Sequence, residues 1–263
     1  MLTLSLYALL PMALLALGGW LASLIKNDVS IADSLWPLFI LLAAASYAIA
    51  VPQTGPRTLV VVALVAFWAV RLAAHITWRS WGEPEDRRYQ AMRARNDPNF
   101  RWKSLVLVFG LQAALAWVVS LSVLAAVLNP RPWHWIDSLG VVVIIFGTLF
   151  EAVADWQLAR FKADPAHQGQ VMDRGLWRNS RHPNYFGEFC TWWGFFLIAL
   201  SPQGWWALAS PLLMTFLLLK VSGVALQEKD IADRRPGYGE YIARTNAFFP
   251  GRRRHSSRAK LDT

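Results

Sequence analysis

The residues best suited to chemistry lie in one short stretch, RHPNYFGE, from Arg181 to Glu188. The apolar run FCTWWGFFLIAL follows it directly, so the stretch stands where a membrane helix would meet water. His182 precedes Pro183, which disfavours the α region before it and suits the first turn of a helix. A helix start has free backbone N–H groups, and cationic side chains beside it add to its attraction for anions. The stretch therefore predicts an anion-binding site at the membrane surface.

Polar side chains continue into the opening turns of that expected helix. Asn184 and Glu188 are four residues apart and share a face, with Tyr185 beside them. The alternative is a positive-inside anchor, with Arg181 at the membrane surface and Tyr185 in the aromatic belt. That alternative explains Arg181 and Tyr185 but explains Asn184 and Glu188 poorly, because Glu188 lies at the edge of the apolar run.

A second group of polar residues lies in the segment FEAVADWQLARFK. Glu151, Asp155 and Lys162 follow helical spacing and share one face. Two carboxylates one turn apart repel unless cations or hydroxyl donors satisfy them. Such carboxylates suit ribose hydroxyls, and Lys162, Arg160 or another Arg suits a 2′-phosphate. Ion pairing among these groups is the alternative.

Ionisable residues also occur inside apolar segments. Asp33 lies several residues into the second apolar block, where an ionised group costs about 2.5–3.5 kcal/mol at the helix centre. The alternative for Asp33 is an N-cap near the interface. Arg71, His75 and Arg79 recur every four residues and form one stripe. We expect this stripe to face the bundle interior beside Asp33, although Arg79 alone would also suit an interfacial anchor.

These residues must be positioned by helices that cross a bilayer. Of the 263 residues, 55% are hydrophobic, and they come in blocks long enough to span a membrane. This predicts an all-α, polytopic membrane protein with one domain, residues 1–251, and a basic tail, residues 252–263, that we expect to be disordered. The seven predicted spans are residues 2–25, 31–51, 58–78, 104–128, 136–161, 185–200 and 205–225.

Charge predicts the topology. The net charge is +9, and with seven crossings the three most basic segments lie on one side of the membrane. The positive-inside rule then places the N-terminus outside and the C-terminus in the cytoplasm. Topology accounts for the charge and no recognition module accompanies it, so we do not expect nucleic-acid binding. The five His show no metal spacing, and the single Cys gives no disulfide framework.

Several of these motifs together resemble the steroid 5α-reductase family, particularly its bacterial members. The resemblance spans most of Asp33 to Pro250. Similar RHPNY signatures occur in sterol C14 reductases and in isoprenylcysteine or phospholipid methyltransferases, but the combination with ADWQLARFK and EDRRY favours the reductases. The motifs are DSLW, AVRLAAHITWR, EDRRY, FEAVADWQLARFK, GLWRNSRHPNYFGE and RPGYGEYIARTNAFFP.

The resemblance implies a seven-helix enzyme of the bacterial inner membrane that uses NADPH on the cytoplasmic side. It would reduce the C4–C5 double bond of a 3-oxo-Δ4-steroid or a similar enone lipid, and no protein partner is implied. The cofactor contacts that carry over are Arg79, Glu151, Asp155, Lys162, Asn184 and Glu188, with Arg160, Arg174, Arg181, His182, Tyr185 and Tyr241 as additions.

The resemblance also implies how the substrate carbonyl is polarised. Asp33 matches an acid on the second helix, and Trp68 occupies the position of the family's tyrosine, with His75 as a substitute donor. We expect Trp36 and Trp68 to contact the substrate as well. Because a carboxylate cannot donate a hydrogen bond, Asp33 is expected to be protonated through burial.

Two other functions remain open from the sequence. A methyltransferase that uses S-adenosylmethionine on a prenylcysteine or a phospholipid would share the RHPNY segment but would need no 2′-phosphate site. A sterol- or lipid-binding scaffold would bind the ligand without consuming NADPH.

Overall fold

The computed structural model describes residues 2–51, 55–221, 223–224, 228, 231 and 235–254. These residues form helices, turns and loops, and no β-strand occurs among them, which confirms the all-α prediction. The chain divides into two compact units. The first comprises Met1–Val141 and Phe195–Pro211, and the second comprises Val142–Gly194 and Leu212–Thr263. A single domain over residues 1–251 stays a prediction.

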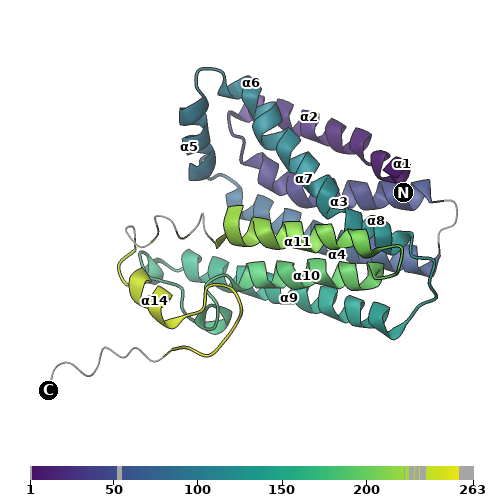
Figure 1. The fold of residues 1–263 in the computed structure, drawn as a ribbon. Helices are drawn as coiled ribbons and strands as arrows, with labels where there is room; N and C mark the ends of the chain where they lie inside the picture. Colours follow the sequence, from purple (N-terminus) through teal and green to yellow (C-terminus); the bar gives the residue numbers. More distant parts are fainter. Residues whose placement is uncertain are drawn as a thin grey trace. The chain divides into compact units, whose positions relative to one another are not determined.

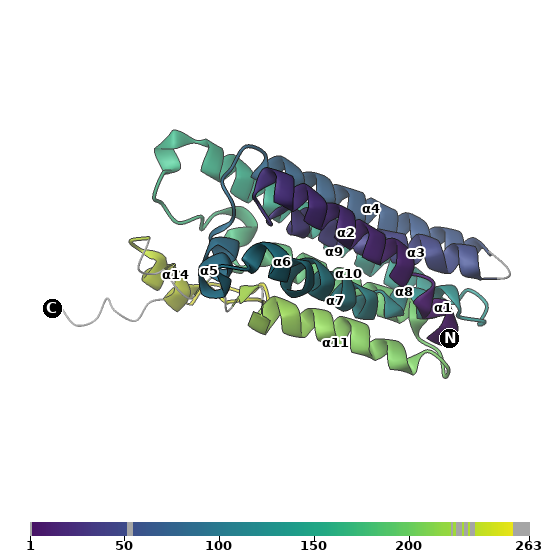
Figure 2. The ribbon, with the colours of Figure 1, turned by 90° about the horizontal axis from the view of Figure 1, so that it is seen from above.

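Three long apolar helices run side by side in the first unit (Figures 1 and 2). A short helix, α1 (Leu2–Leu6), precedes α2 (Leu9–Lys26), and α3 (Ile31–Ala50) and α4 (Pro56–Ser80) follow. α3 packs against both α2 and α4, and Phe39, Tyr47 and Trp68 are completely buried there. Close van der Waals packing of such large side chains helps to hold the three helices together.

The rest of the first unit supplies a fourth apolar segment. α5 (Arg87–Asn96) is short and polar, and Asp86 caps it by accepting a hydrogen bond from the Arg88 N–H at 2.9 Å. The apolar segment then runs through α6 (Phe100–Ser104), a π-helical turn (Leu105–Gly110), α7 (Leu111–Val119) and α8 (Leu121–Val127).

The second unit contains most of two neighbouring helices, α9 (Trp135–Ala163) and α10 (Pro183–Ala199). Pro183 begins α10, as the sequence predicts. Short 3₁₀ turns (Pro165–His167 and Gly175–Arg178) lie in the connection between them. A 3₁₀ turn (Trp205–Leu208), α11 (Ala209–Phe216), a π-helical turn (Leu217–Val221) and α14 (Tyr238–Arg244) complete the described elements.

Within the described residues, five helical segments are long and apolar enough to cross a membrane. They correspond to the first five predicted spans, so the protein is a membrane protein by the length and composition of its helices. The sixth predicted span is α10, with 17 residues, and the seventh is the shorter apolar segment Trp205–Val221. Seven crossings and their orientation stay predictions. Ala225, where the seventh block ends, and residues 255–263 of the tail lie outside the described residues.

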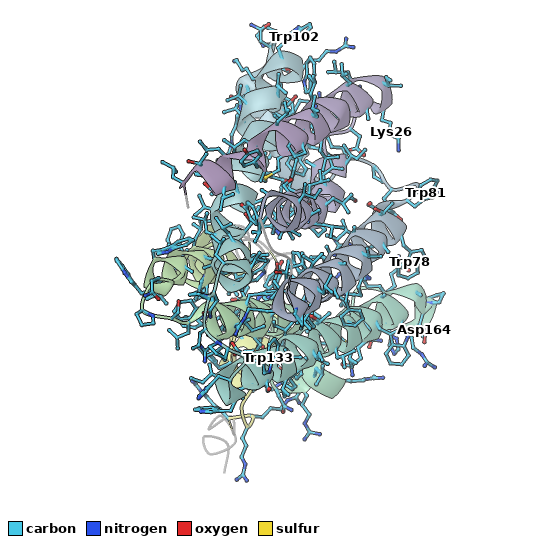
Figure 3. The ribbon with its side chains drawn as sticks, turned by 90° about the vertical axis from the view of Figure 1, so that its right-hand side faces the viewer. Lys26, Trp78, Trp81, Trp102, Trp133 and Asp164 are labelled. Atoms are coloured by element: carbon cyan, nitrogen blue, oxygen red, sulfur yellow. The ribbon has the colours of Figure 1, made fainter. Side chains whose placement is uncertain are left out.

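The outside of the first unit suits lipid and its interface. Leu10 and Leu59 are 69% and 68% exposed, which would be costly in water for so many large apolar side chains. Figure 3 shows Trp81 at the outside, where α4 ends, with Lys26 at the end of α2. The Lys26 ammonium lies 5.8 Å from the Trp81 ring, and paired Trp and Lys of this kind are typical of a membrane interface.

Glycine allows α9 and α10 to pack closely. A Cβ on Gly147 would lie 2.5 Å from the Gly187 carbonyl oxygen, and one on Gly187 would lie 2.6 Å from the Gly147 carbonyl oxygen. The two backbones therefore touch where each helix has no side chain, as is common between membrane helices. This close contact brings the carboxylates of α9 next to the first turns of α10.

We predict that Gly187→Ala lowers the free energy of unfolding by about 1–3 kcal/mol, because the new methyl group must push the two backbones apart. The matched control is Gly18→Ala on α2, where a Cβ meets no atom within 4 Å and a better helix former is gained. Thermal unfolding in detergent should show a lower Tm for Gly187→Ala only; equal Tm values would contradict the close contact.

Candidate functional site

The first candidate cluster surrounds Asp33 in the first turn of α3. The Tyr89 hydroxyl donates to Asp33 Oδ1 at 2.6 Å, and Arg88 Nη2 donates to Asp33 Oδ2 at 2.7 Å. The Asp33 side chain is 22% exposed. Because an ionised carboxylate only accepts hydrogen bonds, these two donors satisfy it on both oxygens.

The motif EDRRY is anchored to the start of α3 by side-chain hydrogen bonds. Glu85 Oε1 accepts from the Val29 N–H at 3.0 Å, and Ser30 Oγ accepts from the Asp86 N–H at 2.8 Å. Asp86 also accepts from Arg88 Nε at 3.0 Å, which orients the guanidinium toward Asp33. These contacts hold Arg88 and Tyr89 opposite a residue more than fifty positions earlier in the chain.

The two residues that donate to Asp33 have shifted pKa values. Burial raises the pKa of the Tyr89 phenol, and the neighbouring Asp33 carboxylate raises it further, so Tyr89 keeps its proton. Burial alone lowers the pKa of the Arg88 guanidinium, but the Asp33 and Asp86 carboxylates outweigh it and raise the pKa overall. Asp33 lies in an ion pair with Arg88, an arrangement that favours the carboxylate over the neutral acid expected there, and Tyr89 is the neighbouring group that keeps a proton.

Sequence reasoning missed Tyr89 and the amide of Gln112. Gln112 Nε2 lies 3.1 Å from the Tyr89 hydroxyl oxygen and 3.3 Å from Asp33 Oδ1. Tyr89 lies in the polar motif EDRRY, whose sequence gives no signal of a contact with Asp33. Gln112 has such a signal, because it is a strongly polar side chain in an apolar span.

The other residues predicted at the substrate lie on α3 and α4. Trp68 is completely buried, and Trp36 is partly buried on the same helix as Asp33. His75 is partly buried, and its ring centroid lies 6.2 Å from that of Trp78. Arg79 is exposed in the last turn of α4. Their roles at the substrate, and that of Arg79 at the cofactor, stay predictions.

The second candidate cluster lies between α9 and α10, in the second unit. Glu151, Asp155 and Glu188 are 3%, 7% and 8% exposed. Asn184 Nδ2 donates to Asp155 Oδ1 at 3.2 Å, while Asn184 Oδ1 is buried with no hydrogen-bond partner in the described part of the chain. Asp155 and Asn184 are therefore in contact, and the unused acceptor of Asn184 suits a hydroxyl donor, while the cofactor role of all four residues stays a prediction.

A cationic and aromatic pocket opens at the end of α9, in the second unit. Its volume is about 320 Å³, near the lower end for small-ligand sites. The Arg160 guanidinium lies 5.5 Å from the Trp156 ring, and the Phe161 and His167 rings are stacked with centroids 4.3 Å apart. The lining residues are Trp156, Gln157, Arg160, Phe161, Asp164, His167, Met172, Arg174 and Gly175.

This pocket contains two of the predicted cofactor residues. Arg160 and Arg174 line it, and Lys162 is exposed two residues after Arg160. Figure 3 labels Asp164, another lining residue, in the loop that follows α9. Two guanidinium groups beside exposed aromatic faces fit a purine ring that carries a phosphate group.

Arg181 and His182, the residues of the predicted anion site, contact a carboxylate of the same chain. Arg181 Nε and Nη2 donate to the two oxygens of Glu228 at 2.6 and 2.8 Å, and His182 Nε2 lies 2.9 Å from Glu228 Oε1. The His182 ring stacks on Tyr185 with centroids 5.5 Å apart. A carboxylate of the same chain thus bonds both side chains in a structural cluster, and their role at the cofactor stays a prediction. Glu228 follows the apolar blocks, and no sequence signal linked it to Arg181.

The C-terminal segment closes over the same region. The Arg181 N–H donates to the Asn246 carbonyl at 2.9 Å, and Ser180 Oγ donates to the Phe248 carbonyl at 2.7 Å. The Tyr241 hydroxyl donates to the Trp177 carbonyl, and the Tyr241 side chain is buried. Tyr241 therefore packs as part of the fold, and its contact with the cofactor stays a prediction.

We predict that the Glu228 cluster stabilises the protein in a pH-dependent way. Burial alone raises the pKa of Glu228, but hydrogen bonds from His182 and Arg181 outweigh it and lower the pKa from 4.5 to about 2. A lowered folded-state pKa gives stability that is present above about pH 4.5 and is lost as the pH falls toward about 2.

Glu228→Gln should therefore lower the Tm at pH 7, and the difference from the wild type should close between about pH 4.5 and about pH 2. Glu240→Gln, at an exposed position of α14, is the control and should leave the Tm unchanged across this range. A constant Tm difference for Glu228→Gln at all pH values would contradict the cluster.

Comparison with known proteins identifies the family. Residues 19–245 match the family model described as "Protein of unknown function (DUF1295)". No curated protein and no solved structure matches the chain. Because the match covers both candidate clusters and most of the sequence, the chain belongs to the DUF1295 family.

Proposed function

We propose that the protein uses NADPH to reduce the carbon–carbon double bond of an apolar enone, such as a 3-oxo-Δ4-steroid or a similar lipid. The observation that carries the proposal is the protonated Tyr89 hydroxyl held at Asp33 by the first turn of α3. Reduction of an enone needs such a donor, because hydride addition at the β-carbon leaves negative charge on the carbonyl oxygen.

The proposed roles follow from the contacts in the first cluster. Tyr89 turns its O–H from Asp33 to the carbonyl oxygen of the substrate and stabilises the charge that develops there. Asp33 remains ionised and paired with Arg88, so it orients the phenol and does not donate a proton itself. The α-carbon takes its proton from solvent, and the overall reaction consumes one hydride and one proton.

The second unit supports the cofactor part of the proposal. NADPH, when bound, supplies the hydride. Arg160 and Arg174 would hold the 2′-phosphate of its adenosine, and Trp156 would stack on the adenine ring. The acceptor groups of Asp155, Asn184 and Glu188 would bind ribose hydroxyls, as suits buried carboxylates and an amide oxygen without a partner in the described chain.

The test is consumption of NADPH by the purified protein in detergent or liposomes with a panel of enones. The panel includes progesterone- and testosterone-like steroids and short apolar enones. Binding of S-adenosylmethionine with no NADPH oxidation would favour the methyltransferase instead. Binding of a steroid with neither activity would favour the lipid-binding scaffold.

We predict that Tyr89→Phe lowers kcat by about 10²–10⁴-fold, because the phenylalanine ring keeps the packing but loses the donor. Asp33→Asn should lower kcat less than Asp33→Leu, because the amide can still hold the Tyr89 hydroxyl. Tyr7→Phe, at an exposed position near the N-terminus, is the matched control. Wild-type kcat for Tyr89→Phe would rule out the proposed donor.

We predict that Arg160→Ala and Arg174→Ala raise the KM for NADPH while leaving the KM for NADH nearly unchanged, because only NADPH carries the 2′-phosphate. The control is Arg178→Ala, which removes an exposed arginine that does not line the pocket. Equal increases in KM for the two cofactors would contradict a phosphate contact at these residues.

A further inference from the structure

Gln112 joins the Tyr89 cluster from a helix that has no other strongly polar side chain near it. Its Nε2 donates to the Tyr89 hydroxyl oxygen at 3.1 Å and approaches Asp33 Oδ1 at 3.3 Å. This assignment of the amide is the one that chemistry requires, because an ionised carboxylate can only accept. The Tyr89 oxygen thus donates one hydrogen bond to Asp33 and accepts one from Gln112.

A local distortion of the fourth apolar segment sets the direction of Gln112. Leu105–Gly110 is a π-helical turn, and the Leu111 N–H bonds to the carbonyl of Val106, five residues back. Such a turn contains one extra residue, which rotates everything after it by about 100° relative to a continuous α-helix. Without the turn, Gln112 would point to a different side of the helix from Tyr89.

The turn leaves little room for a side chain at Gly110. A Cβ at Gly110 would lie 3.1 Å from the Leu105 carbonyl oxygen, closer than ordinary van der Waals contact. Leu105 belongs to the same turn, so the added methyl would press on its backbone. Gly110 therefore offers a way to move Gln112 without changing any residue of the cluster.

Stability alone does not account for Gln112. Its Oε1 is buried and has no hydrogen-bond partner among the described residues. A half-satisfied buried amide in an apolar helix costs free energy that an apolar side chain of the same shape would not cost. Asp33 already has Tyr89 and Arg88 as donors, so it does not need Gln112 for its pairing.

We infer that Gln112 is a positioning residue for the proposed reduction, an inference that rests on the proposed function. Its amide N–H fixes the rotation of the Tyr89 hydroxyl and stabilises the negative charge that the phenol oxygen acquires as it hydrogen-bonds to the developing oxyanion. This contact strengthens in the transition state and does not touch the apolar body of the substrate. It therefore affects kcat and not KM.

The experiment compares Gln112→Met with the wild type in the NADPH–enone assay. Met has nearly the shape of Gln but cannot donate to Tyr89. We expect kcat to fall about tenfold, KM to change less than twofold, and the Tm to stay equal or rise. Gly110→Ala should reproduce the loss of kcat with every group of the cluster present. Ser46→Ala is the control, because Ser46 is a partly buried polar residue of α3 that bonds only to the Leu42 carbonyl.

A readout that needs no turnover separates the two proposals. The ¹³Cζ resonance of Tyr89, assigned by its loss in Tyr89→Phe, reports the hydrogen bonds of the phenol. It should shift in Gln112→Met and not in Ser46→Ala. Wild-type kcat or an unshifted resonance in Gln112→Met would overturn the role of Gln112, and so would a loss of kcat that only parallels a fall in Tm. If the wild type consumes no NADPH, the proposed function fails, whatever the resonance shows.

Discussion

The pairing of Asp33 is the interaction on which the first candidate site depends. A carboxylate at the start of an apolar helix must be neutralised and hydrogen-bonded, because lipid cannot solvate it. Arg88 supplies the charge and Tyr89 supplies the second donor, and both come from a short polar helix that Asp86 and Glu85 fix against α3. The Asp33 carboxylate therefore determines where the Tyr89 phenol, which keeps its proton, lies.

The second unit relies on a different constraint, the absence of side chains where two helices cross. Gly147 and Gly187 let the backbones of α9 and α10 touch, and Asp155 of α9 then accepts a hydrogen bond from Asn184 of α10. Burial of polar groups at such a contact is unfavourable in itself. It is reasonable in a site that binds a polar ligand, and the oxygen of Asn184, which has no partner among the described residues, is what such a site would retain.

Some of this could be predicted from the sequence, and the reasons are physical. Runs of apolar residues fix the helices, since backbone groups in lipid must bond within their own segment. Helical periodicity placed Glu151 with Asp155 and Asn184 with Glu188. The contact of Tyr89 with Asp33, and that of Glu228 with Arg181, join residues far apart in the chain, and periodicity carries no information on such pairs.

Two features had signals that were too weak to interpret. Gly110 in an apolar helix is compatible with a π-helical turn, but the same residue is common in ordinary membrane helices. Arg181 and His182 were correctly placed before the first turn of α10, where an anion is expected. Only the three-dimensional arrangement identifies that anion as a carboxylate from the same chain.

The hydrogen bonds between the residues before α10 and the C-terminal segment also affect how the protein folds during its synthesis. Arg181 and Ser180 leave the ribosome more than sixty residues before Asn246 and Phe248, whose carbonyls they bond. Until those residues emerge, water must hydrate the cationic side chain of Arg181. The contacts of this segment with residues 246–248 therefore form only after a long stretch of chain has been synthesised.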